Sequence, residues 1–426
     1  MISIQTIRDN PELVVERLKL KYFDAQEVVS SIMDIDKQRR ETQRQVDELK
    51  NQANKLAKEI GGLYKSGKAE EANQLKETVT KNKETIKSLD ADFADLDKKQ
   101  LDLLLALPNI PCYDVPSGKL ASDNKEVKQE GSLEFSADLL PHWELTSIYK
   151  LIDFELGNKI TGAGFPVYTN KGARLQRALM NFFLDENTAA GYQETQPPIV
   201  VNSDSAYGTG QLPDKEGQMY EVPNDGLYMI PTAEVPLTNI FRDTIWNTAD
   251  LPIKLTGYTP CFRREAGSYG KDVRGLNRLH QFDKVEIVQV QEPSKSYEAL
   301  EEMVNHVEGL LKKLELPYRI LALCGGDISF ASAFTYDFEV YSAGQKRWLE
   351  VSSVSNFEAF QANRLKLRYK DENGKNKLAH TLNGSSLAFP RILASLLENH
   401  QTGAGIKIPK ALVPYCGFDM ITDPKV

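Results

Sequence analysis

Two long runs of regularly spaced apolar residues near the start of the chain constrain its fold more than any other feature. In the first run, apolar or neutral residues stand at positions 32, 35, 42, 46, 49, 53, 56, 60 and 63, and Arg39 occupies the one position that breaks the pattern. The second run extends from Ala72 to Leu107. Alternating spacings of three and four, sustained over about five heptads in each run, predict two coiled-coil helices.

Glycines separate the two runs, at Gly61, Gly62 and Gly67. They allow the chain to reverse there, so the two helices are expected to pair antiparallel as an arm over residues 31–107. At ~1.5 Å per residue, helices of about forty residues give an arm about 60 Å long. An isolated hairpin of that length cannot be the core of a domain, so we expect it to reach for a partner.

The charges of the predicted arm are divided between its helices. The cationic residues of the first helix are Arg39, Arg40, Arg44, Lys50, Lys55 and Lys58. The acidic residues at the end of the second are Asp90, Asp92, Asp95, Asp97 and Asp102. A charged run is most often a solvated helix face. The functional alternative is an arm that grips RNA, with the basic helix on phosphates and no reading of bases.

Length and composition limit the class of protein. A chain of 426 residues predicts two or three domains, and 41% hydrophobic residues suffice for a large core. With a net charge of −8, nucleic acid must be bound by a local basic face. No apolar run is long enough to span a bilayer, and the start lacks a secretion signal. The scattered cysteines, without a Cys-x-x-Cys pair, favour a reducing cytoplasm; they are Cys112, Cys261, Cys324 and Cys416.

A β-hairpin is predicted over residues 258–290. A strand enters at Tyr258, a polar glycine-rich loop follows over 266–275, and a second strand returns from Leu279. The chemistry-bearing residues of the hairpin are Arg263, Arg264, Glu265, Phe282 and Glu286. Cations, a flat ring and acids suit a substrate with a phosphate, a flat base and an amine. The plainer interpretation is a surface hairpin with ordinary charges.

A stretch that imitates a phosphate-binding loop lies at the predicted tip of the arm. Gly62, Gly67 and Lys68 have the glycine and lysine spacing of such a loop. The next residue is Ala69, where a serine or threonine would hold magnesium, and a helix precedes the stretch instead of a strand. We therefore reject a phosphate-binding loop here.

Proline residues after the arm mark a linker at 108–116, and residues 117–140 are expected to be irregular. Residues 174–190 predict a long amphipathic helix that ends at Gly191, with a strand from Glu194 through Pro197 and Pro198. Strands then mix with helices without regular alternation, and no dinucleotide-binding glycine motif occurs. The predicted class is therefore α+β, with a mixed, mainly antiparallel sheet flanked by helices and the two-helix coiled-coil arm before it.

Three further stretches offer groups for chemistry. Thr232 and Glu234, on either side of Ala233, can receive an ammonium group, or else cap a helix. A strand over 348–357 carries a carboxylate and hydroxyls that suit magnesium, although an ordinary strand edge explains it equally well. Small residues at 383–386 precede a helix that should begin near Pro390. Arg391 in its first turn would add to the positive helix end and make an anion site.

Taken together, these motifs resemble the class II aminoacyl-tRNA synthetases, and specifically the seryl-tRNA synthetase family. Residues 174–198 resemble motif 1, residues 262–265 motif 2 and residues 383–391 motif 3. The segments that resemble seryl-specific ones are 208–213, 231–234, 280–286, 350–353 and 356–365. Ser386 and Pro390 depart from the family, which more often has glycines there. The resemblance divides the chain into an N-terminal tRNA-binding domain, 1–110, and a class II catalytic domain, 111–426.

The resemblance implies that serine's carboxylate attacks the α-phosphorus of ATP, after which the seryl group passes from the adenylate to the 3′ end of tRNA(Ser). Arg263, Glu286 and Arg391 would be catalytic. The serine-binding residues would be Thr232, Ala233, Glu234, Arg263, Glu286 and Ser385. The ATP-binding residues would be Arg263, Arg264, Glu265, Leu279, Phe282, Glu350, Val351, Ser352, Ser353 and Arg391. Magnesium would be held by Glu350 and Ser353.

The roles that the resemblance implies are specific. Arg263 would bridge the serine carboxylate and the α-phosphate, and Arg391 would meet the γ-phosphate. Phe282 would stack on the base, and Glu265 would accept from its amino group. Glu286 would hold the serine ammonium and hydroxyl. The resemblance also implies a homodimer through motif 1, and it leaves open whether tRNA(Sec) is charged as well.

Two other functions compete with this one. A paralogue could activate an amino acid and load a carrier protein, but such a role needs no RNA-gripping arm. A non-catalytic coiled-coil regulator or scaffold could be built on an inactive synthetase domain, but the intact Arg263, Glu286, Glu350 and Arg391 argue against it. His280, His306 and His380 are interpreted as structural, because the implied chemistry needs no histidine base.

Overall fold

The computed structural model describes residues 1–136, 138–214, 217–265 and 274–422. By its internal contacts the chain divides into two units. One consists of residues 2–19 and 23–108, and the other of Met1, Leu20–Tyr22 and residues from 109 onward. The units are described separately below. None of the helices formed by the described residues combines the length and the apolar character that a bilayer crossing requires.

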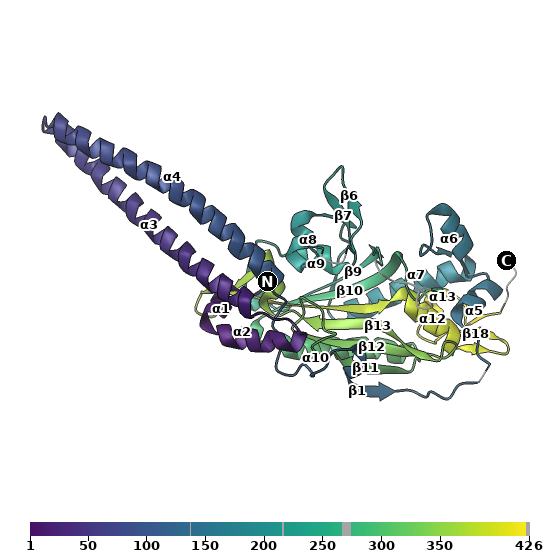
Figure 1. The fold of residues 1–426 in the computed structure, drawn as a ribbon. Helices are drawn as coiled ribbons and strands as arrows, with labels where there is room; N and C mark the ends of the chain where they lie inside the picture. The colour runs from purple at the N-terminus through teal and green to yellow at the C-terminus, as the bar shows by residue number, and fades with distance from the viewer. Residues whose placement is uncertain (137, 215–216, 266–273, 423–426) are drawn as a thin grey trace. The chain divides into compact units, whose positions relative to one another are not determined.

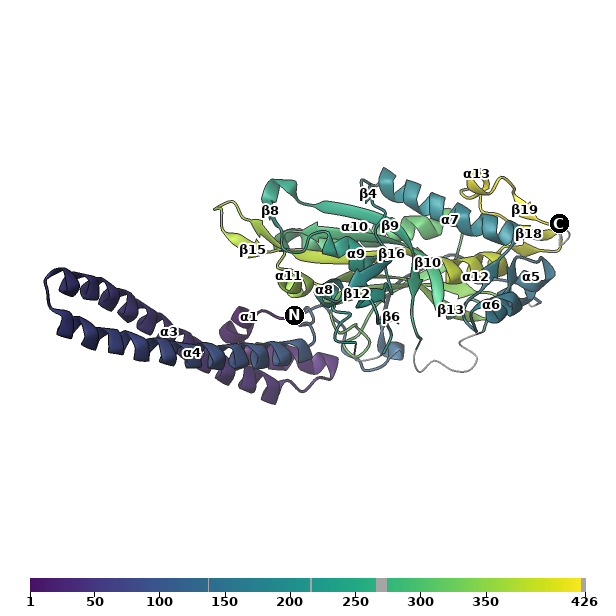
Figure 2. The same cartoon turned by 90° about the horizontal axis from the view of Figure 1, so that it is seen from above.

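The N-terminal unit contains the predicted pair of long helices. Two short helices come first, α1 (Ile4–Asp9) and α2 (Pro11–Leu18), and Pro11 is the first residue of α2. The long helices are α3 (Gln26–Lys65) and α4 (Ala69–Ala106). Figure 2 shows them side by side along their length. The helical pair is confirmed.

The turn of the arm is shorter than predicted. Gly61 and Gly62 lie inside α3, in open space, instead of in the turn. The reversal occurs at Ser66–Lys68, where Gly67 has a φ of +80°, a conformation that glycine adopts without steric cost. One glycine therefore makes the reversal, and the helix continues through the other two because flanking heptads hold it.

Arg39 fits into the interior of the arm although it breaks the apolar pattern. Its guanidinium lies 5.4 Å from the ring centroid of Phe93 on α4. Its Nη1 is 3.2 Å from Oδ1 of Asp97, one turn further along α4. The long side chain thus covers an aromatic ring with its charge paired at the edge, which lets an arginine replace an apolar residue at an interface between helices.

A buried carboxylate joins the helices at the base of the arm. Asp36 on α3 has no exposed surface, and Arg8 of α1 holds both of its oxygens, at 2.7 and 2.6 Å. Arg40 donates to the same carboxylate at 2.9 Å, and buried Gln100 of α4 donates at 3.3 Å. Burial opposes ionisation, but these donors together lower the pKa of Asp36. One anion therefore ties α1, α3 and α4 together.

The larger unit is built on an eight-stranded sheet (Figure 1). Its strands, in spatial order, are β1 (Lys125–Glu130), β11 (Tyr318–Ala322), β12 (Phe334–Ser342), β13 (Arg347–Asn356), β16 (His380–Ala388), β10 (Gln281–Gln291), β9 (Ile253–Phe262) and β4 (Gln193–Glu194). Neighbouring strands are antiparallel except β4 and β9, which are parallel. The predicted α+β class and mainly antiparallel sheet are confirmed.

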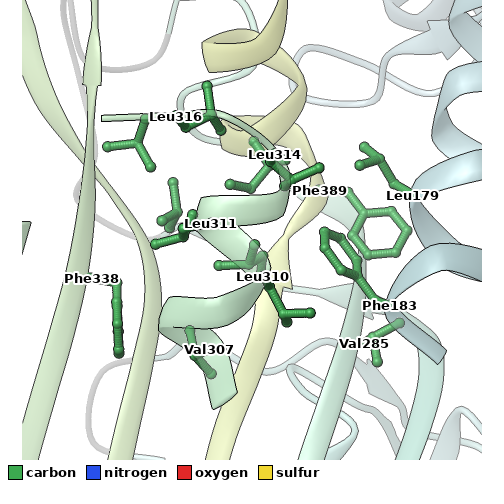
Figure 3. Close-up of a cluster of buried hydrophobic side chains, with 14 of the residues drawn as sticks. Leu179, Phe183, Val285, Val307, Leu310, Leu311, Leu314, Leu316, Phe338 and Phe389 are labelled. Atoms are coloured by element: carbon green, nitrogen blue, oxygen red, sulfur yellow. The ribbon is translucent and has the colours of Figure 1, made fainter. Parts of the chain in front are cut away.

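Three helices cover one face of this sheet: α7 (Asn170–Ala189), α10 (Ser296–Lys313) and α12 (Phe389–Asn399). They bury the main hydrophobic core against alternate residues of the strands, such as Val285 and Phe338. Figure 3 shows Leu310 of α10 near Phe183 of α7 and Phe389 of α12. The α7 helix confirms the amphipathic helix predicted over 174–190, with a start four residues earlier.

The opposite face carries a smaller core under two short helices, α9 (Glu234–Asn239) and α11 (Ala359–Leu365). Leu237 of α9 and Leu365 of α11 pack there with Val288 of β10, whose neighbours Val285 and Ile287 belong to the other face. Alternate residues of β10 therefore point to opposite sides of the sheet. Polar residues of β10 on the side of α9 are available for a site.

Two expectations about strands are wrong. Residues 117–140 were expected to be irregular, but β1 pairs with β11 at the edge of the sheet, between Lys125 and Glu130. All six residues of β1 are exposed, so the hydrophobic alternation that identifies strands is missing. The single strand expected after Gly191 is divided into β4 and β5 (Val200–Asn202), because two consecutive prolines cannot continue a ladder.

The remaining elements form the periphery of the larger unit. The smaller sheets contain β2 (Ile152–Asp153) with β3 (Val167–Tyr168), β5 with β7 (Leu227–Met229) and β6 (Glu221–Val222), β8 (Ile245–Asn247) with β14 (Arg368–Lys370) and β15 (Asn376–Leu378), and β17 (Gln401–Thr402) with β18 (Gly405–Lys407) and β19 (Met420–Ile421). The short helices are α5 (His142–Ile148), α6 (Phe154–Ile160), α8 (Ser203–Thr209) and α13 (Val413–Cys416). The 3₁₀ turns are Lys19–Lys21, Ala121–Asp123, Thr248–Asp250 and Pro293–Lys295.

Candidate active site

The predicted hairpin is formed by β9 and β10, which pair antiparallel from Phe262 opposite Gln281. Most of the predicted loop, residues 266–273, lies outside the described residues. Phe282 and Glu286 lie on the same side of β10, because their separation is an even number of residues. Arg263 comes directly after β9, and its backbone N–H donates to the carbonyl of His280 at 3.0 Å. The hairpin therefore collects a cation, a ring and an acid on one face.

Glu286 is at the centre of a buried polar cluster. Its side chain is 1% exposed. Lys284 Nζ lies 2.5 Å from Oε2, Thr232 Oγ1 donates to Oε2 at 3.4 Å, and Asn383 Nδ2 donates to Oε1 at 3.2 Å. Burial raises the pKa of Glu286, while the charges of Lys284 and Arg263 oppose that rise. A carboxylate surrounded by donors on β10, β16 and the loop before α9 can bind a cationic group.

A second acid, Glu234, lies beside this cluster at the start of α9. Gln361 of α11 donates to its Oε1 at 2.6 Å. Burial, and then the nearby charge of Glu286, raise the pKa of Glu234 to about 7. Thr232 Oγ1 accepts from the backbone N–H of Glu234 at 3.2 Å and from Lys284 Nζ at 2.8 Å. The plainer interpretation, Thr232 as a helix N-cap, is wrong: the N-cap of α9 is Ala233, and Thr232 stabilises the turn before it while also facing the cluster.

Arg263 is positioned by the backbone and by a ring. Its Nε donates to the carbonyl of Pro231 at 3.2 Å, and its guanidinium lies 5.2 Å from the ring centroid of Phe282. Its positive charge reaches both Glu286 and Glu234, since it favours the ionised form of each. The structure therefore brings five sequence-predicted residues together: Thr232, Glu234, Arg263, Phe282 and Glu286.

A β-bulge in β13 forms a second cluster. Ser353 pairs with Asp337 of β12, and Glu350 pairs with Glu339, so β13 has one extra residue between them. Residues three apart in a regular strand face opposite sides, but the extra residue turns Glu350 and Ser353 to the same side. Val351 and the partner strand's Phe338 belong to the main core. Glu350 and Ser353 therefore lie on the face that also carries Glu286.

Arg391 meets this second cluster. It lies in the first turn of α12, one residue after Pro390. Its Nη1 donates to the carbonyl of Glu350 at 2.7 Å and lies 3.6 Å from the carboxylate Oε2, and its Nε donates to the carbonyl of Asn277 at 3.1 Å. The arrangement confirms that a helix begins near Pro390, and it places a cation beside the predicted metal ligands.

Other predicted residues have more structural surroundings. Leu279 and Val351 are buried in the main core, and Ser352 donates to the carbonyl of Ser385 at 2.6 Å. Ser385 lies opposite Glu286 in the ladder between β10 and β16. Ala233 packs in the smaller core. These residues mainly pack against the elements that carry the two clusters and contribute few polar groups to them.

The rest of motif 2 lies at the end of the hairpin. Arg264 is exposed, with its guanidinium 5.8 Å from the ring centroid of Tyr220. Glu265 has a φ of +47° and forms an ion pair with Arg278 at 2.9 Å. Neither side chain is locked into the scaffold by burial of its charge.

Each of the three histidines interpreted as structural is hydrogen bonded to the scaffold. The Nδ1 of His280 lies 3.0 Å from the carbonyl of Arg263, and the Nδ1 of His380 lies 2.8 Å from Ser296 Oγ. The Nε2 of His306 lies 2.7 Å from Asn187 Oδ1. Burial lowers the pKa of His380 to about 4 and also lowers that of His306. Rings that are bonded internally in this way fit a structural role.

Four polar residues of these clusters were not predicted: Lys284, Asp337, Gln361 and Asn383. Lys284 shares a face of β10 with Glu286 by simple alternation, which is a signal that could have revealed it. Asp337 becomes a neighbour only through the register of β12 and β13, and Gln361 only through the packing of α11. The local sequence therefore gives no signal that predicts the positions of Asp337 and Gln361 in the clusters.

A cavity of about 310 Å³ lies on the other face of the sheet, beneath α7. Gln176 Nε2 and Tyr258 Oη each donate to the carboxylate of Asp283 at 2.8 Å within its wall. Its lining residues are Tyr168, Ala173, Gln176, Arg177, Met180, Tyr258, Asp283 and Phe389. None of them belongs to the predicted site, so the cavity and the polar clusters are separate features of opposite faces.

Comparison with known families gives two matches that together cover most of the chain. Residues 1–111 match the seryl-tRNA synthetase N-terminal domain. Residues 219–400 match the class II core domain of tRNA synthetases for glycine, histidine, proline, serine and threonine. The second match contains the hairpin and both polar clusters.

Individual relatives agree over the full length. A serine–tRNA ligase of Salinibacter ruber is 50% identical over 424 residues, which are 99% of each chain. One of Prosthecochloris aestuarii is 46% identical, again over 99% of each chain. Among solved structures, seryl-tRNA synthetase from Pyrococcus horikoshii, complexed with ATP, superimposes with a TM-score of 0.92 at 34% identity and 99% coverage of both chains.

Proposed function

This chain belongs to the seryl-tRNA synthetase family, and from that premise we propose how its residues divide the work of the reaction. It is a class II aminoacyl-tRNA synthetase, a serine–tRNA ligase that activates serine with ATP and charges tRNA(Ser). The observation that carries the assignment of roles is the convergence of Arg263 with the buried acid Glu286 and its neighbours on one face of the sheet.

We propose that the cluster around Glu286 binds serine. Burial raises the pKa of Glu286, and the positive charge of the substrate ammonium would favour its ionised form. Thr232, Ala233 and Glu234 form the wall nearest the ammonium, and Ser385 adds a hydroxyl from β16. The serine carboxylate then points toward Arg263. A pocket whose buried groups bond a hydroxyl discriminates strongly against alanine, since those groups are left unpaired without it.

We assign ATP to the region between Arg263 and Arg391. Phe282 stacks on the adenine, with Leu279 behind it, and Glu265 accepts from the exocyclic amine once it exchanges its partner Arg278. Arg391 binds the γ-phosphate. The remaining residues assigned to ATP, with less direct contacts, are Arg264, Val351 and Ser352. Cationic groups at both ends of the triphosphate lower the repulsion between two approaching anions.

The residues of the second cluster fit magnesium. Glu350 and Ser353 offer a carboxylate and a hydroxyl on one side of the bulge, and oxygen ligands are those that magnesium prefers. Asp337 Oδ1 is buried nearby and has no hydrogen-bond partner among the described residues. In the part of the chain that the structure describes, no three acidic, histidine or cysteine side chains form a complete metal site. A magnesium shared with phosphates fits that incomplete set.

The activation step needs no protein nucleophile. The serine carboxylate oxygen forms a bond to the α-phosphorus, and the bond from that phosphorus to the bridging oxygen breaks, so pyrophosphate leaves and seryl-adenylate remains. Arg263 contacts both reacting anions and holds them in line. Bound magnesium would neutralise charge on the phosphates. A ribose hydroxyl at the tRNA end then attacks the seryl carbonyl and releases AMP.

The arm and the motif 1 helix carry the proposed interactions with macromolecules. We propose that α3 grips the tRNA backbone through its cationic residues and that two copies associate through α7, in a reducing cytoplasm. The second proposal predicts a sedimentation mass near twice 47.9 kDa. Charging of tRNA(Sec) would follow if its long arm presents the same backbone surface, and the relatives named above speak only of serine.

The decisive experiment is pyrophosphate exchange into ATP, measured with each amino acid in turn. Serine alone should support exchange, and charging of tRNA(Ser) should require the arm. Exchange with a different amino acid would contradict the pocket assignment. Serylation of a carrier protein with no charging of tRNA would favour the paralogue that loads carriers. Absence of exchange with intact folding would favour the scaffold.

A further inference from the structure

His142, the first residue of α5, is a fully buried histidine with no role in the assignments above. Its Nε2 accepts from the backbone N–H of Leu276 at 2.8 Å. Because a backbone N–H can only donate, Nε2 carries the free lone pair and the ring hydrogen lies on Nδ1. Nδ1 in turn donates to Oε1 of Glu398 at 2.8 Å. One imidazole therefore connects the last turn of α12 with the main chain at Leu276.

Glu398 is a firm anchor for this histidine, because its side chain has no exposed surface and both of its oxygens accept hydrogen bonds. Oε1 also accepts from the backbone N–H of His142 at 2.9 Å and from Gln345 Nε2 at 3.1 Å. Oε2 accepts from the backbone N–H of Gly344 at 3.2 Å and from Ser342 Oγ. Burial opposes ionisation, but the bonds from His142 and Ser342 lower the pKa of Glu398. This bonded carboxylate fixes where the imidazole ring lies.

The main chain approaches the ring closely at Gly275. A Cβ at this position would lie 2.2 Å from His142 Nε2, and Gly275 has a φ of +65°, which glycine adopts without steric cost. The residue before it is held by the same helix, since the guanidinium of Arg274 lies 4.5 Å from the ring centroid of Trp143. The start of α5 therefore holds the chain over residues 274–276.

The segment that His142 holds also supports Arg391. The carbonyl of Asn277, directly after Leu276, accepts from Arg391 Nε at 3.1 Å, and the carbonyl of Glu350 accepts from Nη1 at 2.7 Å. Asn277 Nδ2 donates to Gln345 Oε1 at 2.9 Å. Since the guanidinium is planar and two of its nitrogens are bonded to main-chain carbonyls, its orientation depends on where those carbonyls lie.

We propose that His142 is a positioning residue for Arg391: by holding Leu276, it places the Asn277 carbonyl where that carbonyl orients the guanidinium toward the triphosphate. The inference rests on the proposed role of Arg391 at the γ-phosphate. His142 acts through the main chain and does not itself contact a substrate. The acceptor at Nε2 therefore matters more than the rest of the ring.

Binding of ATP and ADP tests this, because only ATP has the γ-phosphate. The dissociation constants of both nucleotides for the full-length protein are measured by calorimetry with Mg²⁺ and without serine. His142→Asn keeps a donor near the Nδ1 position and loses the acceptor for Leu276. It should bind ATP about tenfold more weakly, the contribution of one hydrogen bond, and ADP within about twofold of the unmodified protein. His142→Gln places an amide oxygen near the Nε2 position and should recover most of the ATP affinity.

His306→Asn is the matched control. His306 also bonds the scaffold through Nε2, but on α10 and to Asn187 of α7. The control should lower thermal stability and leave the dissociation constants of both nucleotides within about twofold. If His142→Asn weakens ATP and ADP equally, or if His142→Gln binds ATP as weakly as His142→Asn, the positioning role is wrong.

A second variant keeps the proposal testable if thermal unfolding shows that His142→Asn does not fold. Gln345 is half-buried, and Gln345→Ala removes the side-chain bond to Asn277. It should weaken ATP about threefold and leave ADP unchanged. Equal affinities of this variant and the unmodified protein for ATP would contradict the proposal.

Arg391 has its own test in the same measurement. Arg391→Gln should weaken ATP but not ADP. If it weakens neither, the assignment of the γ-phosphate to Arg391 fails, and the role of His142 fails with it. If it weakens ATP while His142→Asn does not, only the further inference fails. In the double variant His142→Asn should add nothing to the loss caused by Arg391→Gln, and additive losses would show that His142 acts by another route.

Discussion

The base of the arm and the proposed serine pocket both bury carboxylates, but with opposite effects on their pKa values. Asp36 is held by Arg8, Arg40 and Gln100, and these donors lower its pKa. Glu234 and Glu286 lie side by side in the pocket, and burial raises the pKa of each. At the base of the arm the donors outweigh burial, whereas in the pocket burial outweighs the nearby Lys284 and Arg263, and such perturbed acids are typical of a functional site.

In the pocket, burial therefore disfavours the ionised form of both acids, an unfavourable term that we call the electrostatic deficit of the pocket. Lys284 and Arg263 compensate part of it, since each lowers the pKa of Glu286. The ammonium of serine is expected to compensate the rest. At the base of the arm no such deficit remains, because every oxygen of Asp36 has a donor within the unit.

The largest expected effect comes from removing Arg263, the cation that we propose serves both substrates. Arg263→Gln should lower serine-dependent pyrophosphate exchange about 10³-fold, or about 4 kcal/mol, because two anions then meet without it. The neighbouring Arg264→Gln is the matched control and should cost no more than about tenfold. Equal effects of the two variants would mean that half-buried Arg263 contributes no more to the reaction than exposed Arg264.

The next effect concerns the fully paired carboxylate. Asp36→Ala should destabilise the base of the arm by about 3 kcal/mol, since Arg8 is left without its partner. Because its folded pKa is lowered, the stabilisation is present above the unfolded value of about 3.9 and is lost as the pH falls through the folded value. Hydrogen exchange of the start of α3 measures the loss.

Exposed Asp47, on the same helix, provides the control for that experiment. Asp47→Ala should change stability by no more than about 0.5 kcal/mol. If hydrogen exchange at the start of α3 were as slow in Asp36→Ala as in Asp47→Ala, the buried ion pairs would contribute nothing to stability. The contrast drawn between the base of the arm and the pocket would then fail.

A third prediction tests whether the arm and the pocket act separately. Replacing residues 45–88 with a short glycine-rich turn keeps Asp36, Gln100 and the pair of Arg39 with Phe93, while it removes most of α3's charged surface. The kcat/KM for charging tRNA(Ser) should fall about 100-fold, or about 2.7 kcal/mol, with pyrophosphate exchange within twofold of the full chain. Exchange that falls in parallel with charging would show that the arm supports the pocket itself.

The smallest expected effect is a pH dependence of serine binding. Glu234 has a pKa of about 7, so the fraction that is ionised rises by about tenfold between about pH 6 and about pH 8. The KM for serine should fall by about the same factor over that range, as the ionised acid attracts the ammonium. Glu234→Gln should show a high KM that no longer follows pH.

The same titration affects stability in the opposite direction. A raised pKa means that the folded state binds the proton more tightly than the unfolded state, so this group lowers stability as the pH rises from about 4.5 through about 7. The KM for ATP is the internal control and should not follow pH with Glu234. A serine KM that is flat with pH would remove Glu234 from the ionised pocket.

The arm could be predicted from sequence because its contacts are local and periodic. Heptads located α3 and α4, and even Arg39 was recognised as the break in the pattern. The buried Asp36 was not, because its position lies beside the seam and its burial depends on Arg8, 28 residues away. Helical periodicity reports which face is covered but not which charge is paired.

Site residues could be predicted where a short motif specifies both the residue type and its position in the sequence. Arg263, Phe282 and Glu286 were found because their side chains stand out chemically on one predicted hairpin and match segments of the family. Asp337 was missed because its contact with Ser353 requires the register of two strands, which local sequence does not specify. The exposed strand β1 was missed for a related reason, since all of its side chains are polar or exposed.

The extra residue at Val351 gives β13 one residue more than β12 between the two proposed metal ligands. If Glu350 and Ser353 were placed three residues apart on a regular strand, or if the extra residue were deleted, their side chains would face opposite sides of the sheet. One of the two oxygens would then point into the hydrophobic core. A designed protein that uses the same pair of ligands would therefore need the same β-bulge.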